Sequence, residues 1–168
     1  MSTLYRGRVW KFGDHINTDL IMPGDSMYGK VPKEEMKYHA FKAIRPEFAR
    51  QVRSGDIIVA GKNFGSGSSR PATRILKDLG ISCIVAESFA QLFFRNSINM
   101  GYPVLICTGV TGLFEDGDEA EVELLSGRVT NLKTGQSLQA EPLPPFILRL
   151  IEAGGILALL KRGERLKT

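Results

Sequence analysis

The sequence has few of the residues that usually hold metals. Its 168 residues include two cysteines and two histidines, and no Cys-x-x-Cys pair occurs. Cys83 and Cys107 both lie in apolar, strand-like runs, which predicts buried core thiols. His15 and His39 lie far apart, without the spacing of two ligands on one helix face. The sequence therefore predicts that this chain alone binds neither an iron–sulfur cluster nor a metal ion.

Long apolar runs and clustered charge are also missing. No apolar run approaches the roughly 20 residues of a membrane span, and residues 1–8 lack the apolar core of a signal peptide. We therefore expect a cytoplasmic protein that binds no membrane. The net charge is +4, and the basic tail at residues 161–167 has no interleaved aromatic residues, which argues against nucleic-acid binding. Hydrophobic and charged shares of 43% and 24% predict one globular domain over residues 1–168.

Apolar segments in the middle of the chain alternate between strand-like and helix-like patterns. Strand, helix, strand, helix and strand are predicted in turn at residues 56–60, 71–80, 83–86, 88–99 and 104–107. Ser88 is the expected N-terminal cap of the second helix. This order predicts a parallel α/β unit with right-handed crossovers. Outside it, a strand, two short helices, a β-hairpin and two C-terminal helices are predicted at residues 4–12, 32–41, 46–52, 120–132, 143–155 and 156–162. The fold class is therefore α/β, with additional β-structure beside the parallel unit.

The most informative segment follows the first strand of this unit. Residues 61–70 are Gly-Lys-Asn-Phe-Gly-Ser-Gly-Ser-Ser-Arg, placed between that strand and the next helix. Free backbone N–H groups in such a turn, with the helix dipole behind them, favour an anion. An arginine adds two parallel hydrogen bonds to a carboxylate or phosphate. The segment therefore predicts a site for a small, negatively charged molecule.

A nucleotide- or phosphate-binding module is the main alternative from another functional class. Its support is a glycine-rich turn between strand and helix, with Glu87 about twenty residues further on. However, Arg70 stands where a dinucleotide fold needs its third glycine, and the chain has no room for a second βαβαβ half. The Gly-Lys-Ser/Thr ending of a P-loop is also missing.

Several motifs resemble one protein family in order and spacing. In chain order they are Asn17-Thr18-Asp19-Leu20-Ile21, the loop ending Gly67-Ser68-Ser69-Arg70, Ala86-Glu87-Ser88-Phe89-Ala90, Phe94-Arg95-Asn96, Gly101-Tyr102-Pro103-Val104-Leu105 and Glu152-Ala153-Gly154-Gly155. Together they resemble the small subunit of 3-isopropylmalate dehydratase, which corresponds to the mobile fourth domain of aconitase. The resemblance implies a β/β/α swivelling domain that works with a large partner subunit. That partner would hold a [4Fe–4S] cluster, and the pair would dehydrate and rehydrate a 2-hydroxy acid in leucine biosynthesis.

The resemblance also implies roles for the last residues of the loop. Ser68 would be the base that removes the proton next to a substrate carboxylate, with its alkoxide stabilised by N–H groups of the turn and by nearby cations. Arg70 would bind a substrate carboxylate and hold the acidic carbon near Ser68. Ser69 would cap the helix or donate to the substrate. A helix-capping serine and a surface arginine remain the alternatives for Ser68 and Arg70.

Other matched residues are expected to support the site. Asn63, Gly65 and Gly67 are expected to shape the loop. Asp19 matches an active-site acid of the family, which would contact substrate or pair with a cation or histidine of the partner. An Asp after Asn-Thr is also typical of a turn, and Glu87 is open between a structural and a functional role.

Two departures from the family pattern bear on function. Pro71 follows the loop arginine where many family members carry glutamate, and it favours an extended backbone at Arg70. This keeps open a non-catalytic partner subunit.

The second departure concerns the loop that recognises the substrate's side group in that family. Here the corresponding residues combine apolar surface with one charge, and they are Ser26, Met27, Tyr28, Gly29 and Lys30. The expected substrate is a small 2-hydroxy di- or tricarboxylic acid. Isopropylmalate is the first expectation, with homocitrate, citramalate and dimethylmalate left open.

Overall fold

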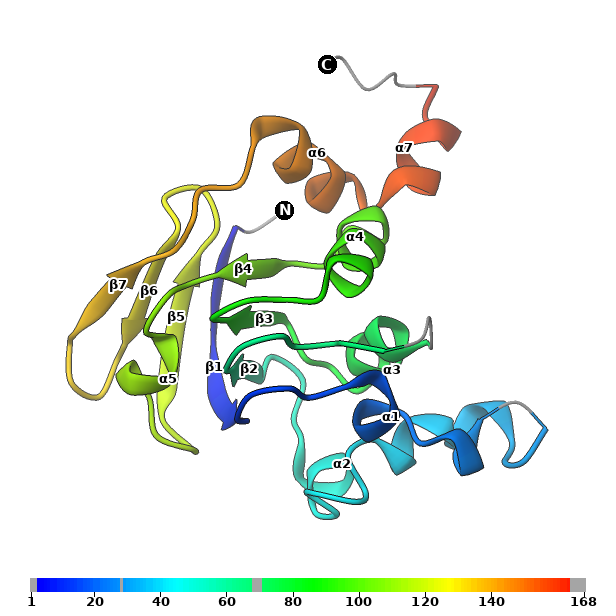
Figure 1. The fold of residues 1–168 in the computed structure, drawn as a ribbon. Helices are drawn as coiled ribbons and strands as arrows, with labels where there is room; N and C mark the ends of the chain where they lie inside the picture. The colour runs from blue at the N-terminus through cyan, green and yellow to red at the C-terminus, as the bar shows by residue number, and fades with distance from the viewer. Residues whose placement is uncertain (1–2, 28, 68–70, 164–168) are drawn as a thin grey trace.

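The computed structural model describes residues 3–27, 29–67 and 71–163 (Figure 1). Within them, seven strands form one mixed sheet in the order β4-β3-β2-β1-β5-β6-β7. The strands are β1 (Leu4–Lys11), β2 (Ile57–Ala60), β3 (Cys83–Ala86), β4 (Val104–Ile106), β5 (Glu119–Glu123), β6 (Arg128–Asn131) and β7 (Ser137–Gln139). Strands β2, β3 and β4 pair in parallel, whereas β5, β6 and β7 pair antiparallel. The predicted fold class, a parallel unit with additional β-structure, is confirmed.

A row of helices accompanies the parallel strands (Figure 1). Helix α3 contacts α4, α4 contacts α6, and α6 contacts α7. The helices are α1 (Thr18–Ile21), α2 (Phe48–Gln51), α3 (Ala72–Asp78), α4 (Gln91–Asn99), α5 (Val110–Leu113), α6 (Pro145–Ala153) and α7 (Ile156–Lys161), with 3-10 helices η1 (Gly24–Ser26) and η2 (Lys33–His39). In the part of the chain that the structure describes, no helix has the length and apolarity needed to cross a membrane.

Strand β1 belongs to both halves of the sheet. Its first part, residues 4–8, pairs antiparallel with β5. Its last part, residues 9–11, pairs in parallel with β2. The parallel unit and the antiparallel strands are therefore joined through a single eight-residue strand.

The point where β1 changes partners is packed tightly against the turn that begins β2. A Cβ atom added to Gly7 would lie 2.0 Å from the carbonyl oxygen of Gly55. Next in the turn, the buried Asp56 carboxylate accepts hydrogen bonds from Trp10 Nε1 (2.8 Å) and Arg8 Nη2 (3.1 Å). Backbone close approach and a buried carboxylate thus fix β1 against β2.

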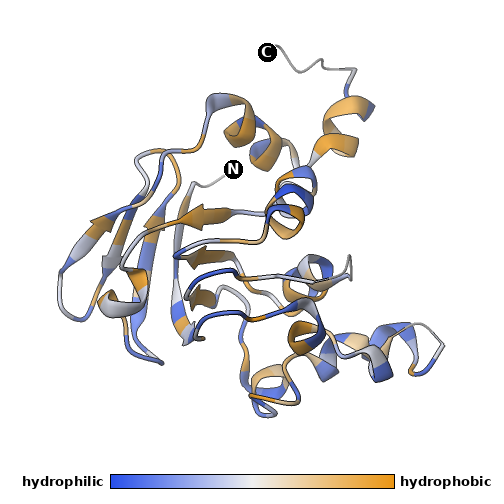
Figure 2. Cartoon of the chain, viewed as in Figure 1, coloured by the Kyte–Doolittle hydropathy of each residue, from blue (hydrophilic) through white to orange (hydrophobic). Residues whose placement is uncertain are grey.

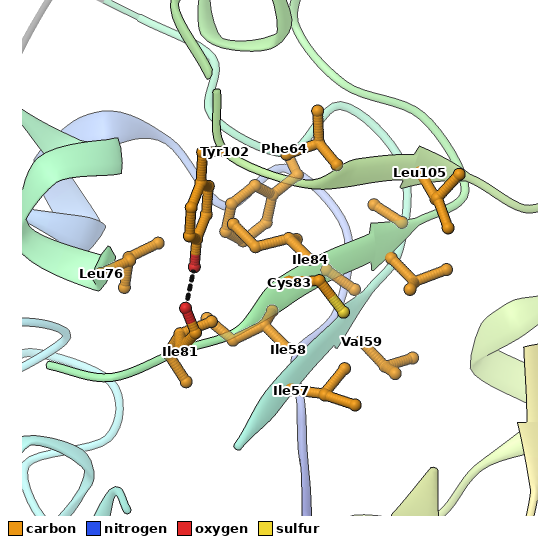
Figure 3. Packing of buried hydrophobic residues seen from close by; sticks show 14 of the residues in the cluster. Ile57, Ile58, Val59, Phe64, Leu76, Ile81, Cys83, Ile84, Tyr102 and Leu105 are labelled. Atoms are coloured by element: carbon orange, nitrogen blue, oxygen red, sulfur yellow. Dashed lines mark hydrogen bonds between the residues drawn. The ribbon is translucent and has the colours of Figure 1, made fainter. Parts of the chain in front are cut away.

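The parallel strands form the centre of the core, as their continuous apolar runs predict. All residues of β2 and β3 are buried, and Figure 3 shows Ile58, Ile84 and Leu105 packed with their neighbours. The buried Tyr102 donates its hydroxyl hydrogen to the carbonyl of Ile81 at 2.6 Å (Figure 3). This hydrogen bond joins the turn before β4 to the turn before β3, in addition to the apolar contacts.

Both cysteines are buried, which confirms their prediction as core thiols. Burial raises the pKa of the Cys83 thiol to about 12 and that of Cys107 to about 11. Both side chains are therefore neutral thiols near pH 7.

Some predicted elements differ from the structure. Within the predicted helix at residues 32–41, Lys33–His39 form the 3-10 helix η2, whose bonds join residues three apart, as between Ala40 N and the Lys37 carbonyl (3.3 Å). Helix α4 begins at Gln91, so Ser88 is not its cap. Instead, the Ser88 hydroxyl oxygen accepts from the backbone N–H of Asn63 at 2.8 Å. The Ser88 hydroxyl therefore makes a tertiary hydrogen bond to the loop and does not cap the start of α4.

The partner change in β1 predicts a strong effect of a single methyl group. We expect Gly7→Ala to lower the free energy of unfolding by about 3 kcal/mol, because backbone has to move away from the new Cβ. Gly13→Ala is the matched control, since a Cβ there meets no atom within 4 Å. Urea unfolding of both variants measures the difference. A Gly7→Ala protein as stable as the control would show that β1 and the turn at Gly55 separate at little cost.

Candidate active-site loop

Three chain segments run side by side beyond the ends of β1, β2 and β3. The middle one, residues 61–67, is called the glycine–serine loop below. On one side it is bonded to the segment after β1. His15 N donates to the Lys62 carbonyl, Gly65 N to the Ile16 carbonyl and Thr18 N to the Ser66 carbonyl, each at 2.7 Å. The loop is therefore held along its length by the chain that leads into α1.

On its other side the glycine–serine loop is bonded to the segment after β3. Phe64 N donates to the Ser88 carbonyl (3.1 Å), and Ala90 N donates to the Phe64 carbonyl (3.0 Å). The Phe64 ring is buried and meets the rings of Phe89 and Phe93 edge-on, with centroids 6.0 and 5.3 Å away. Phe64 thus anchors the loop to the core, while Lys62 and Gly67 are exposed.

The loop backbone uses conformations that suit glycine. Gly65 has φ +85°, and an added Cβ would lie 2.2 Å from the Phe93 ring. Gly67 has φ +107°, with Thr18 Oγ1 only 3.1 Å from an added Cβ. Asn63 also has a positive φ, +57°, which asparagine tolerates better than most residues. The three residues predicted to shape the loop lie at its left-handed positions.

The residues expected to perform the chemistry follow directly. Ser68, Ser69 and Arg70 lie outside the described residues, as does Tyr28 of the expected specificity segment. On the far side, Pro71 immediately precedes α3, which begins at Ala72.

The Asn17-Thr18-Asp19 motif lies against the end of the glycine–serine loop. Asn17 caps the short helix α1, its Oδ1 accepting from Leu20 N at 2.8 Å. Thr18 is buried and bonded to Ser66. Asp19 is exposed, and its Oδ1 accepts from Gly24 N at 3.3 Å. The motif therefore brings a solvent-facing carboxylate to the neighbourhood of the loop.

The expected specificity segment begins at Ser26, the last residue of η1. Ser26 is buried, and its hydroxyl donates to Asp25 Oδ1 (2.9 Å) and accepts from Lys42 Nζ (2.8 Å). The hydrogen bond from Lys42 lowers the pKa of Asp25. Met27 is partly buried against the core, whereas Gly29 (φ +77°) and Lys30 are exposed. In the described part of the segment, Lys30 therefore offers charge to solvent while Ser26 is engaged in the protein.

Two polar residues beside the loop had no motif to mark them. His15 has φ +56° and its Nδ1 lies 3.3 Å from Nδ2 of Asn63. Asp14 Oδ1 accepts from Lys62 N at 2.7 Å. The sequence signal was only their position after a strand that proves to be the neighbour of β2.

Glu87 is bound to the other side of the fold. Its Oε1 accepts from Gly109 N (3.0 Å) and its Oε2 from Thr111 Oγ1 (3.3 Å), which ties the end of β3 to α5. Two donors already occupy the carboxylate that a dinucleotide fold would offer to a ribose. The described residues also contain no group of three or more His, Cys, Asp or Glu side chains that could hold a metal ion.

Comparisons with known proteins agree with this geometry. The family model of the aconitase C-terminal domain matches residues 16–106, which include the glycine–serine loop and its neighbours on both sides. A crystal structure of 3-isopropylmalate dehydratase from Methanocaldococcus jannaschii superposes with a TM-score of 0.87, at 34% identity, over 95% of both chains.

Curated relatives align over almost the whole chain. The 3-isopropylmalate dehydratase small subunit 1 of Methanopyrus kandleri is 52% identical, over 96% of this chain and 95% of its own. The isopropylmalate/citramalate isomerase small subunit of M. jannaschii is 45% identical, over 96% of both. The methanogen homoaconitase small subunit of Methanothermobacter thermautotrophicus is also 45% identical, over 93% and 90%. The chain therefore belongs to the aconitase C-terminal domain family, among small subunits of the 3-isopropylmalate dehydratase type.

Proposed function

We propose that this chain is the small subunit of a two-chain hydro-lyase that interconverts 2- and 3-isopropylmalate in the cytoplasm, as a step of leucine biosynthesis. Residues 1–168 would act as one swivelling domain. The observation that supports this most is the hydrogen bonding between the glycine–serine loop and the segment leading into Asn17, Thr18 and Asp19. Two motifs that are far apart in the sequence meet beside the residues expected to do the chemistry.

In this proposal Ser68 acts as the base. Its Oγ takes the proton from the carbon next to a substrate carboxylate, and the electron pair of that C–H bond becomes the alkene bond. The hydroxyl group on the neighbouring carbon leaves as water, after protonation by a group outside this chain. Adding water back with the opposite regiochemistry returns the proton from Ser68 and gives the isomer.

Arg70, Ser69 and Asp19 would position the substrate. A guanidinium binds a carboxylate through two parallel hydrogen bonds, so Arg70 would fix the acidic carbon relative to Ser68 and stabilise the charge that develops. Asp19 is exposed in this chain, which suits a carboxylate that completes its contacts with substrate or with a partner side chain.

The [4Fe–4S] cluster implied by the family is proposed for the large partner subunit. The residues present here do not fit a cluster, because a cluster is held by a set of cysteine thiolates, whereas the chain has two cysteines and both are buried in the core. The partners proposed for this chain are therefore the large subunit and a small hydroxy acid, with no nucleic acid or membrane.

Related substrates define the alternatives. The printed names of similar small subunits include citramalate isomerase and homoaconitase, and dimethylmalate is a further candidate. One observation favours a more acidic substrate, namely the exposed Lys30 at the end of the specificity segment. The partly buried Met27 favours an apolar side group, and isopropylmalate is our first choice. A non-catalytic partner subunit remains the alternative that Pro71 raises.

The role of Ser68 gives the first test. Ser68→Ala in the reconstituted complex should lower kcat about a thousandfold, because a positioned base contributes about 10²–10⁴, while the affinity for the large subunit stays unchanged. Turnover of 2-isopropylmalate is followed by ultraviolet absorbance of the alkene. Ser66→Ala is the matched control, since the Ser66 carbonyl that binds Thr18 N is retained. Full activity of Ser68→Ala would support the alternative that this chain is a non-catalytic partner subunit.

The proposed role of Arg70 is tested by replacing it with lysine, which keeps the positive charge. Arg70→Lys should raise KM about tenfold and lower kcat as well, because an ammonium cannot reproduce the two parallel hydrogen bonds. The exposed Arg74 of α3 provides the matched Arg74→Lys control. Equal kcat and KM for the two variants would show that Arg70 does not bind the substrate.

The identity of the substrate is tested by the ratio of kcat/KM for 2-isopropylmalate to kcat/KM for homocitrate. The wild-type complex should turn over 2-isopropylmalate with a higher kcat/KM than homocitrate. Lys30→Ala should lower the relative kcat/KM for homocitrate about tenfold, because the third carboxylate loses a cation. Lys33→Ala, another exposed lysine nearby, is the control. A higher wild-type kcat/KM for homocitrate would show that the substrate is this tricarboxylic acid and not isopropylmalate.

A further inference from the structure

The row of helices that ends in α7 carries an apolar groove. One hollow of about 430 Å³ lies between α3, α4 and the start of α7. A second, of about 310 Å³, lies between α4, α6 and α7. Both are lined by Asn99 and Ile156, so the two hollows form one continuous surface, called here the helical groove. It extends from Pro71 at one end to Phe146 at the other.

The rim of the helical groove exposes large apolar side chains. Leu157 and Leu160 of α7 are 72% and 60% exposed, and Phe146 of α6 is 45% exposed. Leu157 and Leu160 are three residues apart on one helix, so they share a face. Figure 2 shows α6 and α7 mostly in the hydrophobic colours. Such a concentration of exposed apolar side chains beside a groove is typical of a protein-binding surface.

The groove is held open by backbone contacts. A Cβ added to Gly155, just before α7, would lie 2.7 Å from the Asn99 carbonyl oxygen. A Cβ added to Gly101 would lie 2.4 Å from Gly155 N. The end of α4 and the turn between α6 and α7 are thus pressed together, which fixes the floor of the groove. A preformed surface of this kind binds without ordering its own backbone.

Position and charge indicate what covers the groove. Pro71 lines one end of it and directly follows Arg70, so the groove begins where the proposed active-site loop ends. Under the proposed function, that loop has to face the large subunit. The exposed Lys77 and Arg95 line the groove, and α7 ends with the exposed Lys161 and Arg162. Acidic residues near the groove are fewer than basic ones. Asp78 pairs with Arg74 at 3.6 Å, and Glu152 is the only acidic residue among residues 145–163.

We propose that the helical groove is the surface on which the large subunit docks, through an apolar segment with acidic flanks. This inference rests on the proposed function for the partner's identity. An occupant of that kind covers Leu157, Leu160 and Phe146 and meets the basic rim. Docking there brings the partner's surface to Pro71, next to the catalytic residues.

The test compares two pairs of exposed leucines. The double variant Leu157→Asp and Leu160→Asp places charge in the proposed interface. The control, Leu125→Asp and Leu132→Asp, changes two leucines that are 66% and 44% exposed near the β5–β6 hairpin. All four side chains are at the surface, so both proteins should unfold in urea at the wild-type concentration. Affinity for the cluster-loaded large subunit is measured by sedimentation and by activity as a function of small-subunit concentration.

The α7 variant should raise Kd for the large subunit about tenfold or more, whereas the hairpin control stays within about twofold. At saturating small subunit, kcat should return to the wild-type value, because the change affects docking and not the reaction. If the α7 variant binds the large subunit with a Kd within about twofold of wild type, and the pair turns over its substrate, the proposed docking in the groove is wrong and the proposed function stands.

A second outcome would assign the groove to another occupant. If the wild-type chain alone forms a dimer that the α7 variant dissociates, with unchanged affinity for the large subunit, the groove joins two copies of this chain and the proposal is wrong. If the wild-type pair assembles through the groove but turns over none of the four acids, docking stands and the proposed function falls.

Discussion

The arrangement of the whole sheet depends on the buried carboxylate of Asp56. It lies in the turn before β2 and accepts hydrogen bonds from Trp10 and Arg8 of β1, and from its own neighbour Arg53 N at 2.9 Å. A buried charge is costly unless it is paired and hydrogen-bonded, and here three donors meet it. Because β1 is also the strand that pairs with β5, this one carboxylate aligns the parallel unit with the antiparallel strands. The glycine–serine loop begins at the other end of β2, so its position follows from that alignment.

The motifs shared with the family are explained largely by contacts between segments. Ser88 and Ala90 form the bonds that hold one side of the glycine–serine loop. Gly101 and Gly155 belong to two different motifs and meet where backbone approaches backbone. Much of the recognisable pattern therefore specifies how segments pack, and among these motifs only Asp19 and the few residues after Gly67 are proposed to act on the substrate.

The sequence predicted the parallel unit because its strands are buried on both sides and appear as continuous apolar runs. It also predicted the β5–β6 hairpin and the glycine end of α6, where Gly154 has φ +86°. The short strand β7 was missed because Ser137–Gln139 is a mostly exposed edge strand with one apolar residue. The double pairing of β1 and the loss of Ser88 as a cap depend on non-local partners, which local patterns do not contain. The same holds for the site, since the glycine–serine loop was evident from composition but its bonds to Ile16 and Thr18 were not.

The anchoring of the loop has a consequence for how two chains can share one reaction. Since the loop is bonded on both sides and Phe64 is fixed in the core, its described part cannot reorient without the rest of the parallel unit. A swivelling domain would therefore carry residues 61–67 and the segments bonded to them as part of one rigid body. Pro71 belongs both to the helical groove and to the chain directly after Arg70, so a partner docked in the groove as proposed contacts the residue that follows Arg70. Under the proposed function, assembly and completion of the active site then become the same event, because the proposed base lies on one chain and the proposed cluster on the other.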